Sequence, residues 1–149
     1  MKWVTRAGAT VDRIACPWLI KKFVDSEAEF LYVPVDMVKD VAKRENAIPF
    51  DSPDIELTHY EENGIEYVSF DAIIKKYNLK DPALLEMAKI VRGADSKKSH
   101  EPPAQSAGLK AAAKGFKILA RDDHDNMARQ FPTYDAYYAF CTLQVQAKA

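Results

Sequence analysis

The sequence has few cysteines and no long apolar run. Its two cysteines, Cys16 and Cys141, lie far apart and do not form a metal-type pair, so we expect no structural disulfide. No stretch of about 18 consecutive apolar residues is present, and polar residues follow Trp3 directly. The sequence therefore predicts neither a membrane span nor a signal peptide, and we expect a cytoplasmic protein.

The sequence also lacks an excess of charge of one sign and any internal repeat. Its 149 residues include 21 Lys and Arg against 22 Asp and Glu, for a net charge of -1 and a pI near 6.3. Such a balance provides no basic field for a phosphate backbone, so we expect no direct nucleic-acid partner. The length suits a single domain over residues 1–149.

The sequence predicts short strands and helices in the first half of the chain. Residues 14–24 have the apolar spacing of a helix, and Pro17 is tolerated only near a helix start, which places Cys16 in or just before the first turn. Asn63-Gly64 predicts a tight turn between strands 54–60 and 65–68. Further strands are expected at 3–6, 28–33 and 47–50, and a short helix at 36–44.

Helices are expected to dominate the second half of the chain. One begins at Ser69, and the next begins at Asp81-Pro82 and ends at Gly93. Another contains residues 109–119, and the last begins at residues 122–124, breaks near Pro132 and resumes at Thr133. The expected fold is therefore α+β, with a small, mainly antiparallel sheet packed against several helices and a helix-rich C-terminal half.

Charged and thiol groups gather at the first helix start. Asp12, Arg13 and Cys16 are our candidate catalytic residues, because a helix start and neighbouring arginines lower the pKa of a thiol. Arg6 and Arg13 are the candidate ligands for a small anion. The alternatives are that Cys16 is a small buried residue and that Arg13 forms an ordinary ion pair.

A second set of residues is suited to a metal ion. His59, Asp95 and Asp123 occur at predicted element ends, and imidazole with carboxylate suits zinc, iron or manganese. Asp12 or Asp135 would then support the ligands. The alternatives are a buried structural His59 and helix capping by Asp122 and Asp123, while His100, in a lysine-rich loop, is expected to be solvated.

Several short motifs together resemble a known family. They occur in the order Trp3-Val4-Thr5-Arg6, Asp12-Arg13-Ile14-Ala15-Cys16-Pro17-Trp18-Leu19-Ile20, Ser69-Phe70-Asp71, Val91-Arg92-Gly93-Ala94-Asp95, Asp122-Asp123-His124 and Tyr134-Asp135-Ala136-Tyr137-Tyr138. Over almost its whole length the chain resembles the C-terminal domain of the bacterial chromate-resistance regulator family. It departs from the pattern expected of relatives at Pro17, where alanine is expected, and at Gln105, where an acid is expected.

The resemblance implies a role in the response to chromate, and it leaves the mechanism open. One hypothesis is a protein that binds chromate or a similar oxyanion at Arg6 and Arg13, with redox assistance from Cys16. A second is a metal-dependent hydrolase or oxidoreductase that uses His59, Asp95 and Asp123. A third is an interaction module, because the family's domain often follows a regulatory part; self-association or a regulatory partner protein is compatible with each hypothesis.

Overall fold

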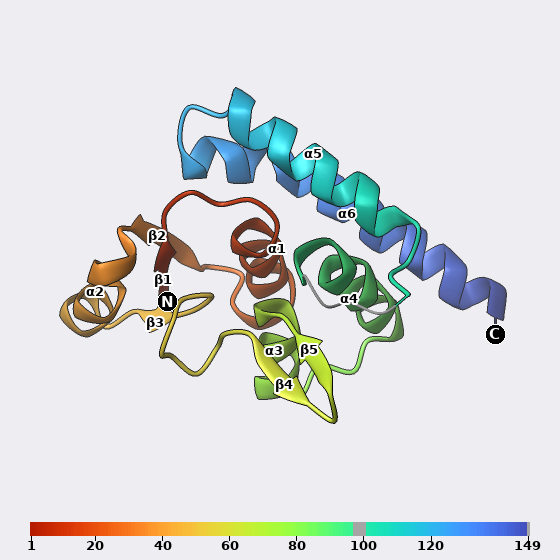
Figure 1. Cartoon of the computed structure of the whole chain (residues 1–149), viewed down its shortest axis with the longest axis horizontal. Helices are drawn as coiled ribbons and strands as arrows, with labels where there is room; N and C mark the ends of the chain where they lie inside the picture. Colours follow the sequence, from red (N-terminus) through yellow and green to blue (C-terminus); the bar gives the residue numbers. More distant parts are fainter. Residues whose placement is uncertain (97–100, 149) are drawn as a thin grey trace.

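The computed structural model describes residues 1–96 and 101–148; His100 lies outside the described residues. Short strands and helices alternate in the first half of the chain, and long helices follow (Figure 1). The strands are β1 (Lys2–Arg6), β2 (Glu29–Val33), β3 (Ile48–Pro49), β4 (Tyr60–Glu62) and β5 (Ile65–Tyr67). The helices are α1 (Asp12–Leu19), the π-helical η1 (Ile20–Val24), the 3-10 turn η2 (Val35–Met37), α2 (Val38–Glu45), α3 (Ser69–Lys76), α4 (Pro82–Asp95), α5 (Gln105–Leu119) and α6 (Asp123–Lys148).

The main sheet is parallel, which corrects the prediction of a mainly antiparallel one. Its order is β2-β1-β3, and β1 pairs in parallel with both neighbours. The reason is the connections: α1 and η1 lie between β1 and β2, and η2 and α2 lie between β2 and β3, and a helical crossover returns the chain in the same direction. The predicted α+β class and the helix-rich C-terminal half are confirmed.

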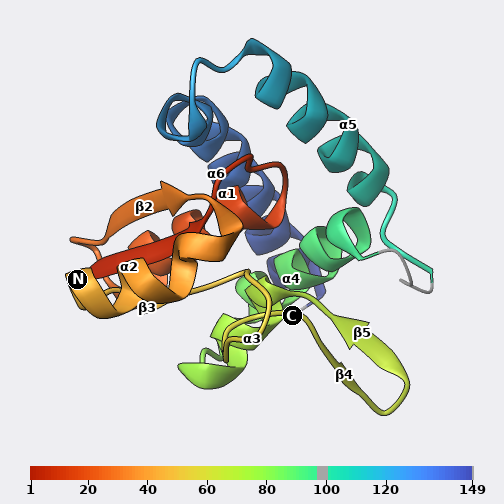
Figure 2. The same cartoon turned by 60° about the vertical axis from the view of Figure 1, so that its left-hand side comes forward.

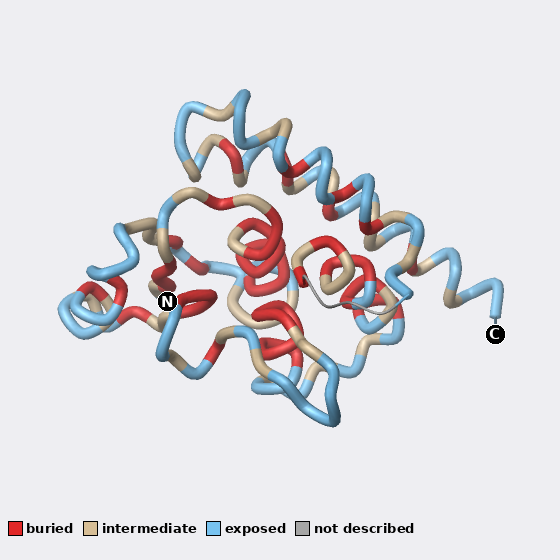
Figure 3. The backbone as a smooth tube through the Cα atoms, viewed as in Figure 1, coloured by how far each residue is buried: buried red, intermediate tan, exposed pale blue. Residues whose placement is uncertain are grey.

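The two faces of this sheet are buried against different partners. Val4 packs with Val38 and Val41 of α2 in a small cluster. Trp3 and Phe30 face the larger core, in which α1 lies at the centre and is buried on nearly every side (Figure 3). Figure 2 shows α2 on the outer side of the sheet and α1 behind it. The opening strand and helix therefore belong to the interior of the molecule.

The hairpin is shorter than predicted, although its turn is at the predicted place. Asn63 and Gly64 have φ values of 54° and 77° and join β4 to β5, which pair from Tyr60↔Tyr67 to Glu62↔Ile65. Residues 54–58 of the expected strand 54–60 are instead a series of turns and bends, and only Tyr60 belongs to β4. The left-handed φ of 60° at Asp54 is incompatible with an extended strand.

Two helices in the C-terminal half, α4 and α6, are longer than predicted. Asp81 caps α4 as expected, because its Oδ1 accepts the Leu84 N–H at 3.0 Å, but α4 continues through Gly93 to Asp95. The predicted break near Pro132 is wrong, and α6 is continuous. Tyr134, buried beyond the proline, anchors the following turn against the core, and such packing offsets the cost of about 3 kcal/mol for a proline inside a helix.

Helices α5 and α6 both pack on α4, and α6 also packs on α1. In Figure 1, α5 and α6 lie side by side along one edge of the molecule, and both contact α4. Asp122 caps α6 as predicted, with its Oδ1 accepting the Asp125 N–H at 2.8 Å. None of the helices in the described part of the chain has an apolar stretch long enough to cross a lipid bilayer.

Candidate functional site

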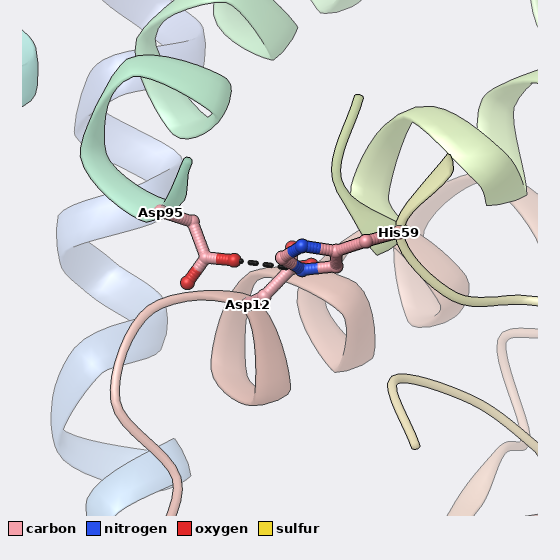
Figure 4. A group of neighbouring side chains, drawn as sticks. All are labelled: Asp12, His59 and Asp95. Atoms are coloured by element: carbon pink, nitrogen blue, oxygen red, sulfur yellow. Dashed lines mark ion pairs between the residues drawn. The ribbon is translucent and has the colours of Figure 1, made fainter. Parts of the chain in front are cut away.

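Three side chains from distant parts of the chain point at one another on one side of the core (Figure 4). Asp12 is the first residue of α1, His59 directly precedes β4, and Asp95 is the last residue of α4. His59 Nε2 lies 3.0 Å from Asp95 Oδ2 and 3.4 Å from Asp12 Oδ2. One ligand atom from each residue lies within 4.8 Å of those of the other two. This spacing allows all three to contact one cation.

Asp12 is held in place by the start of another helix. The residue before α3 is Val68, whose side chain has no acceptor to cap the free N–H groups of the first turn. Asp12 supplies it: Oδ2 accepts the Ser69 N–H at 2.8 Å and Oδ1 accepts the Phe70 N–H at 3.3 Å. The positive end of the α3 dipole favours a carboxylate at this position. The fold thus fixes a buried carboxylate next to His59.

Asp51 is a third carboxylate beside the same imidazole nitrogen. Its Oδ1 lies 3.5 Å from His59 Nε2 and accepts the Ser69 Oγ–H at 2.7 Å, and its Oδ2 accepts Arg13 Nη1–H at 3.2 Å. The side chain is 3% exposed, and the backbone has a left-handed φ of 45°. Buried residues with a strained backbone of this kind often occur at functional sites. Asp51 is not predicted from the sequence, because Asp54 in the same turn-rich segment has an equal local signal.

Burial and like charges dominate the electrostatics of the cluster. Burial, together with the Asp95 and Asp51 carboxylates, raises the pKa of Asp12 to about 7, against an opposing effect of His59. Hydrogen bonds to Asp12 and Asp95 raise the pKa of His59 to about 10. At neutral pH and without a metal, His59 is therefore an imidazolium that lies beside Asp51, Asp95 and an Asp12 side chain that is about half protonated. Its side chain is 35% exposed, so the cluster is open to solvent on the His59 side.

Comparison with known proteins identifies the family. A family model described as ChrB, C-terminal domain, matches residues 3–141. The chain belongs to this family. The chain is also 30% identical, over 125 residues, to Protein ChrB of Cupriavidus metallidurans; the match covers 82% of the chain and 35% of that relative. The chain thus spans about a third of the length of this relative, and no solved structure matches the chain.

Family membership confirms the resemblance drawn from the motifs and supports a chromate-resistance context for this chain. The motif residues that carried the resemblance include Asp12, Ser69 and Asp95. In the structure these three contribute to one cluster, either directly or through the Ser69 N–H.

The two arginines expected to bind an anion already donate hydrogen bonds to acceptors within the chain. Arg13 Nη2 donates to the Gly8 carbonyl at 2.8 Å, in addition to its ion pair with Asp51. Arg6 Nε donates to the Asp51 carbonyl at 3.0 Å. Both arginines therefore donate to Asp51, Arg6 to its backbone carbonyl and Arg13 to its side chain. Arg13 forms the ion pair that was the structural alternative.

Cys16 lies deeper in α1 than predicted. It is the fifth residue of the helix, in the second turn, and is fully buried with its Sγ 3.5 Å from Asp12 Oδ1. Burial, the Asp12 carboxylate and Asp51 raise the pKa of the Cys16 thiol well above its ordinary value. The expectation of a lowered pKa is therefore wrong, because the thiol is fully buried and the neighbouring charges are negative instead of positive.

The structure brings together two of the three residues predicted to bind a metal. His59 and Asp95 lie in one cluster with Asp12. Asp123 lies elsewhere and accepts the backbone N–H groups of Gly8 and Ala9. Asp135 accepts Trp18 Nε1–H at 2.8 Å, lies 3.7 Å from Lys22 Nζ and is 58% exposed.

Proposed function

We propose that this domain binds one divalent transition-metal ion through Asp12, His59 and Asp95, and that the ion serves a metal-dependent reaction in chromate resistance. One observation carries the proposal: a single imidazole nitrogen lies 3.0 to 3.5 Å from carboxylates that come from three separate segments. Imidazole with carboxylates is a donor set suited to zinc, iron or manganese.

The distances between donor atoms suit coordination. Donor atoms about 2.1 Å from a tetrahedral or octahedral ion lie about 3.0 to 3.4 Å from one another. His59 Nε2 is 3.0 Å from the Asp95 oxygen and 3.4 Å from the Asp12 oxygen. An ion that replaces the shared proton of His59 can therefore contact both oxygens, since the three donor atoms lie within 4.8 Å of one another.

The charge of the cluster also favours a divalent cation. Asp12, Asp51 and Asp95 contribute three negative charges, and the Arg13 guanidinium that pairs with Asp51 contributes one positive charge. A divalent cation bound to neutral His59 brings the sum to zero, and burial penalises any charge left uncompensated. Three protein ligands leave coordination positions for water or substrate, as in catalytic metal sites. A hydrolase or an oxidoreductase could use such a site.

Direct binding of chromate at Arg6 and Arg13 has less support. Both guanidinium groups already donate to Asp51 or to the Gly8 carbonyl, and the Asp51 carboxylate that pairs with Arg13 belongs to the acidic cluster around His59. A dianion would have to compete with these acceptors and would meet like charge. The raised pKa of the buried Cys16 thiol also argues against thiolate assistance.

The proposal is tested by measuring metal binding directly. The full chain is purified without added metal, its metal content is measured by mass spectrometry, and binding of Zn²⁺ and Mn²⁺ is titrated by calorimetry after chelation. We expect one ion per chain and an affinity lowered at least about tenfold in Asp95→Asn and His59→Ala. His124→Ala is the matched control, because His124 is exposed and packs on Tyr32 instead of the cluster.

Two results would overturn the proposal. The first is a wild-type chain that binds neither ion, and the second is His59→Ala with the affinity of the wild type. Saturable binding of chromate by the metal-free protein, lost in Arg13→Ala, would instead support the oxyanion hypothesis.

A further inference from the structure

The start of α6 holds the loop between β1 and α1. Asp123 Oδ2 accepts the Gly8 N–H at 3.0 Å, and its Oδ1 accepts the Ala9 N–H at 2.7 Å. In the next turn of α6, Asn126 Nδ2 donates to the Ala9 carbonyl at 3.0 Å. Two residues of α6 thus bind the N–H and the carbonyl of Ala9, which lies more than 110 positions earlier in the chain.

This loop is linked to the candidate metal site by consecutive contacts. Gly8, which donates its N–H to Asp123, accepts Arg13 Nη2–H through its carbonyl at 2.8 Å. Arg13 Nη1 then donates to Asp51 Oδ2 at 3.2 Å, and Asp51 Oδ1 lies 3.5 Å from His59 Nε2. The position of the loop therefore determines where the Arg13–Asp51 ion pair lies.

The same loop also leads directly into Asp12. Residues 7–11 have no regular secondary structure, and Gly8 has a left-handed φ of 86°. The Val11 carbonyl accepts the Tyr134 hydroxyl at 3.3 Å, so Tyr134 is the third residue of α6 that binds this loop, after Asp123 and Asn126. A loop without its own hydrogen-bonded ladder depends on such outside partners for a single conformation. The carboxylate of Asp123, which accepts two N–H groups, is the negatively charged partner among them, and the Arg13 guanidinium at the Gly8 carbonyl is the positively charged one.

We propose that Asp123 is a positioning residue for the metal site: it fixes the β1–α1 loop and thereby Asp12 and the Arg13–Asp51 pair, without contacting the ion. This inference rests on the proposed function. It differs from a ligand role, in which Asp123 would bind the ion itself, and from a purely structural role, in which only the stability of the fold would depend on it.

The experiment compares Asp123 with its neighbour. Asp123→Ala removes both acceptors, Asp123→Asn keeps one, and Asp122→Ala removes the cap of the same helix without a contact to the loop. For each variant of the full chain, Zn²⁺ affinity, the absorption spectrum of the Co²⁺ complex and the melting temperature without metal are measured. The cobalt spectrum reports the donor atoms, and the melting temperature reports the fold.

We expect Asp123→Ala to lower Zn²⁺ affinity about tenfold, with Asp123→Asn between it and the wild type. The stoichiometry of one ion and the positions of the cobalt bands should not change. Asp122→Ala should lower the melting temperature but keep the affinity within about twofold of the wild type.

Several outcomes would contradict this role. Equal losses of affinity in Asp122→Ala and Asp123→Ala, in proportion to lost stability, would show a purely structural effect. Altered cobalt bands in Asp123→Asn would show that Asp123 is a ligand. A wild-type chain that binds no ion would refute the proposed function itself, a result distinct from wild-type binding that is insensitive to Asp123.

Discussion

The Tyr32 hydroxyl donates a hydrogen bond of 2.7 Å to the Arg13 carbonyl. In an α-helix this carbonyl would accept the N–H of the residue four positions later, which is Pro17 and has no N–H. A tyrosine of β2 therefore supplies the hydrogen bond that the proline removes from α1. This contact explains how the helix accommodates a proline in its second turn, further inside than the sequence predicts.

Removing this hydroxyl should weaken the fold in a way that depends on Pro17. Tyr32→Phe leaves the Arg13 carbonyl without its partner, and we expect a loss of about 1 to 2 kcal/mol in the free energy of unfolding. In a Pro17→Ala background the alanine N–H can bond to the same carbonyl, so Tyr32→Phe should cost less by at least about 0.5 kcal/mol. Denaturant unfolding of the four proteins measures both values. Equal costs in the two backgrounds would show that the hydroxyl does not replace the helical hydrogen bond.

The cysteines should be unreactive in the folded protein. Cys16 is fully buried, Cys141 is 2% exposed, and burial raises the pKa of both thiols. We expect dithionitrobenzoate at pH 8 to label neither thiol until denaturant is added, when both react. Cys141→Ser separates the two signals. Rapid labelling of Cys16 in the native Cys141→Ser variant would restore the hypothesis of an accessible thiolate.

Local signals in the sequence predicted most helix starts and the turn of the hairpin. Asp81-Pro82 and Asn63-Gly64 act within a few residues, so their geometry depends little on the rest of the chain. The direction of the main sheet follows from the same kind of signal, because helices are expected at 14–24 and 36–44 between the strands, and a helical crossover makes such strands parallel; the expectation of an antiparallel sheet overlooked this. The continuity of α6 through Pro132 was not predictable from local signals, because it depends on packing against other helices.

The candidate site was predictable only in part for the same reason. His59 and Asp95 stand out as a histidine and an acid at element ends, and the structure brings them together. Asp12 and Asp123 both begin helices and have similar local signals, yet one lies beside His59 and the other holds a loop. Only the tertiary arrangement distinguishes them. Asp51 has no local feature that separates it from other acids in turns.

Gly93 is required by the contact between α4 and α5. A Cβ at this position would lie 2.7 Å from Pro102 Cβ and 2.9 Å from Ser106 Cβ, closer than van der Waals contact. We therefore expect Gly93→Ala to lower the free energy of unfolding by about 1 to 3 kcal/mol, despite the better helix propensity of alanine. Gly108→Ala is the matched control: it is also helical, has open space around it, and should stabilise by about 0.5 to 1 kcal/mol. Equal effects of the two substitutions on the denaturation midpoint would contradict this close contact.

The stability of the metal-free domain should fall as the pH rises. The pKa of His59 is raised from its ordinary 6.5 to about 10, so its stabilising interaction with Asp12 and Asp95 is fully present below pH 6.5 and is lost as the pH approaches 10. The pKa of Asp12 is raised from 3.8 to about 7, so the folded state also retains a proton there that the unfolded state releases, and stability falls over that range too. Denaturant unfolding in a chelator, followed by the fluorescence of the buried Trp3 and Trp18, measures this dependence.

Zn²⁺ should reverse the upper part of this dependence. The ion competes with the proton on His59, so the stabilisation that it provides should grow as the pH rises from about 6 to 8. His59→Gln should flatten the decline of the metal-free protein above pH 6.5 and remove most of the stabilisation by Zn²⁺, whereas His124→Gln, an exposed residue outside the cluster, should change neither. If the decline persists unchanged in His59→Gln, the imidazole is not the proton-binding group of the cluster. If the decline disappears but Zn²⁺ stabilises the wild type equally at every pH, the ion binds elsewhere, because only a ligand that displaces the His59 proton links the two effects.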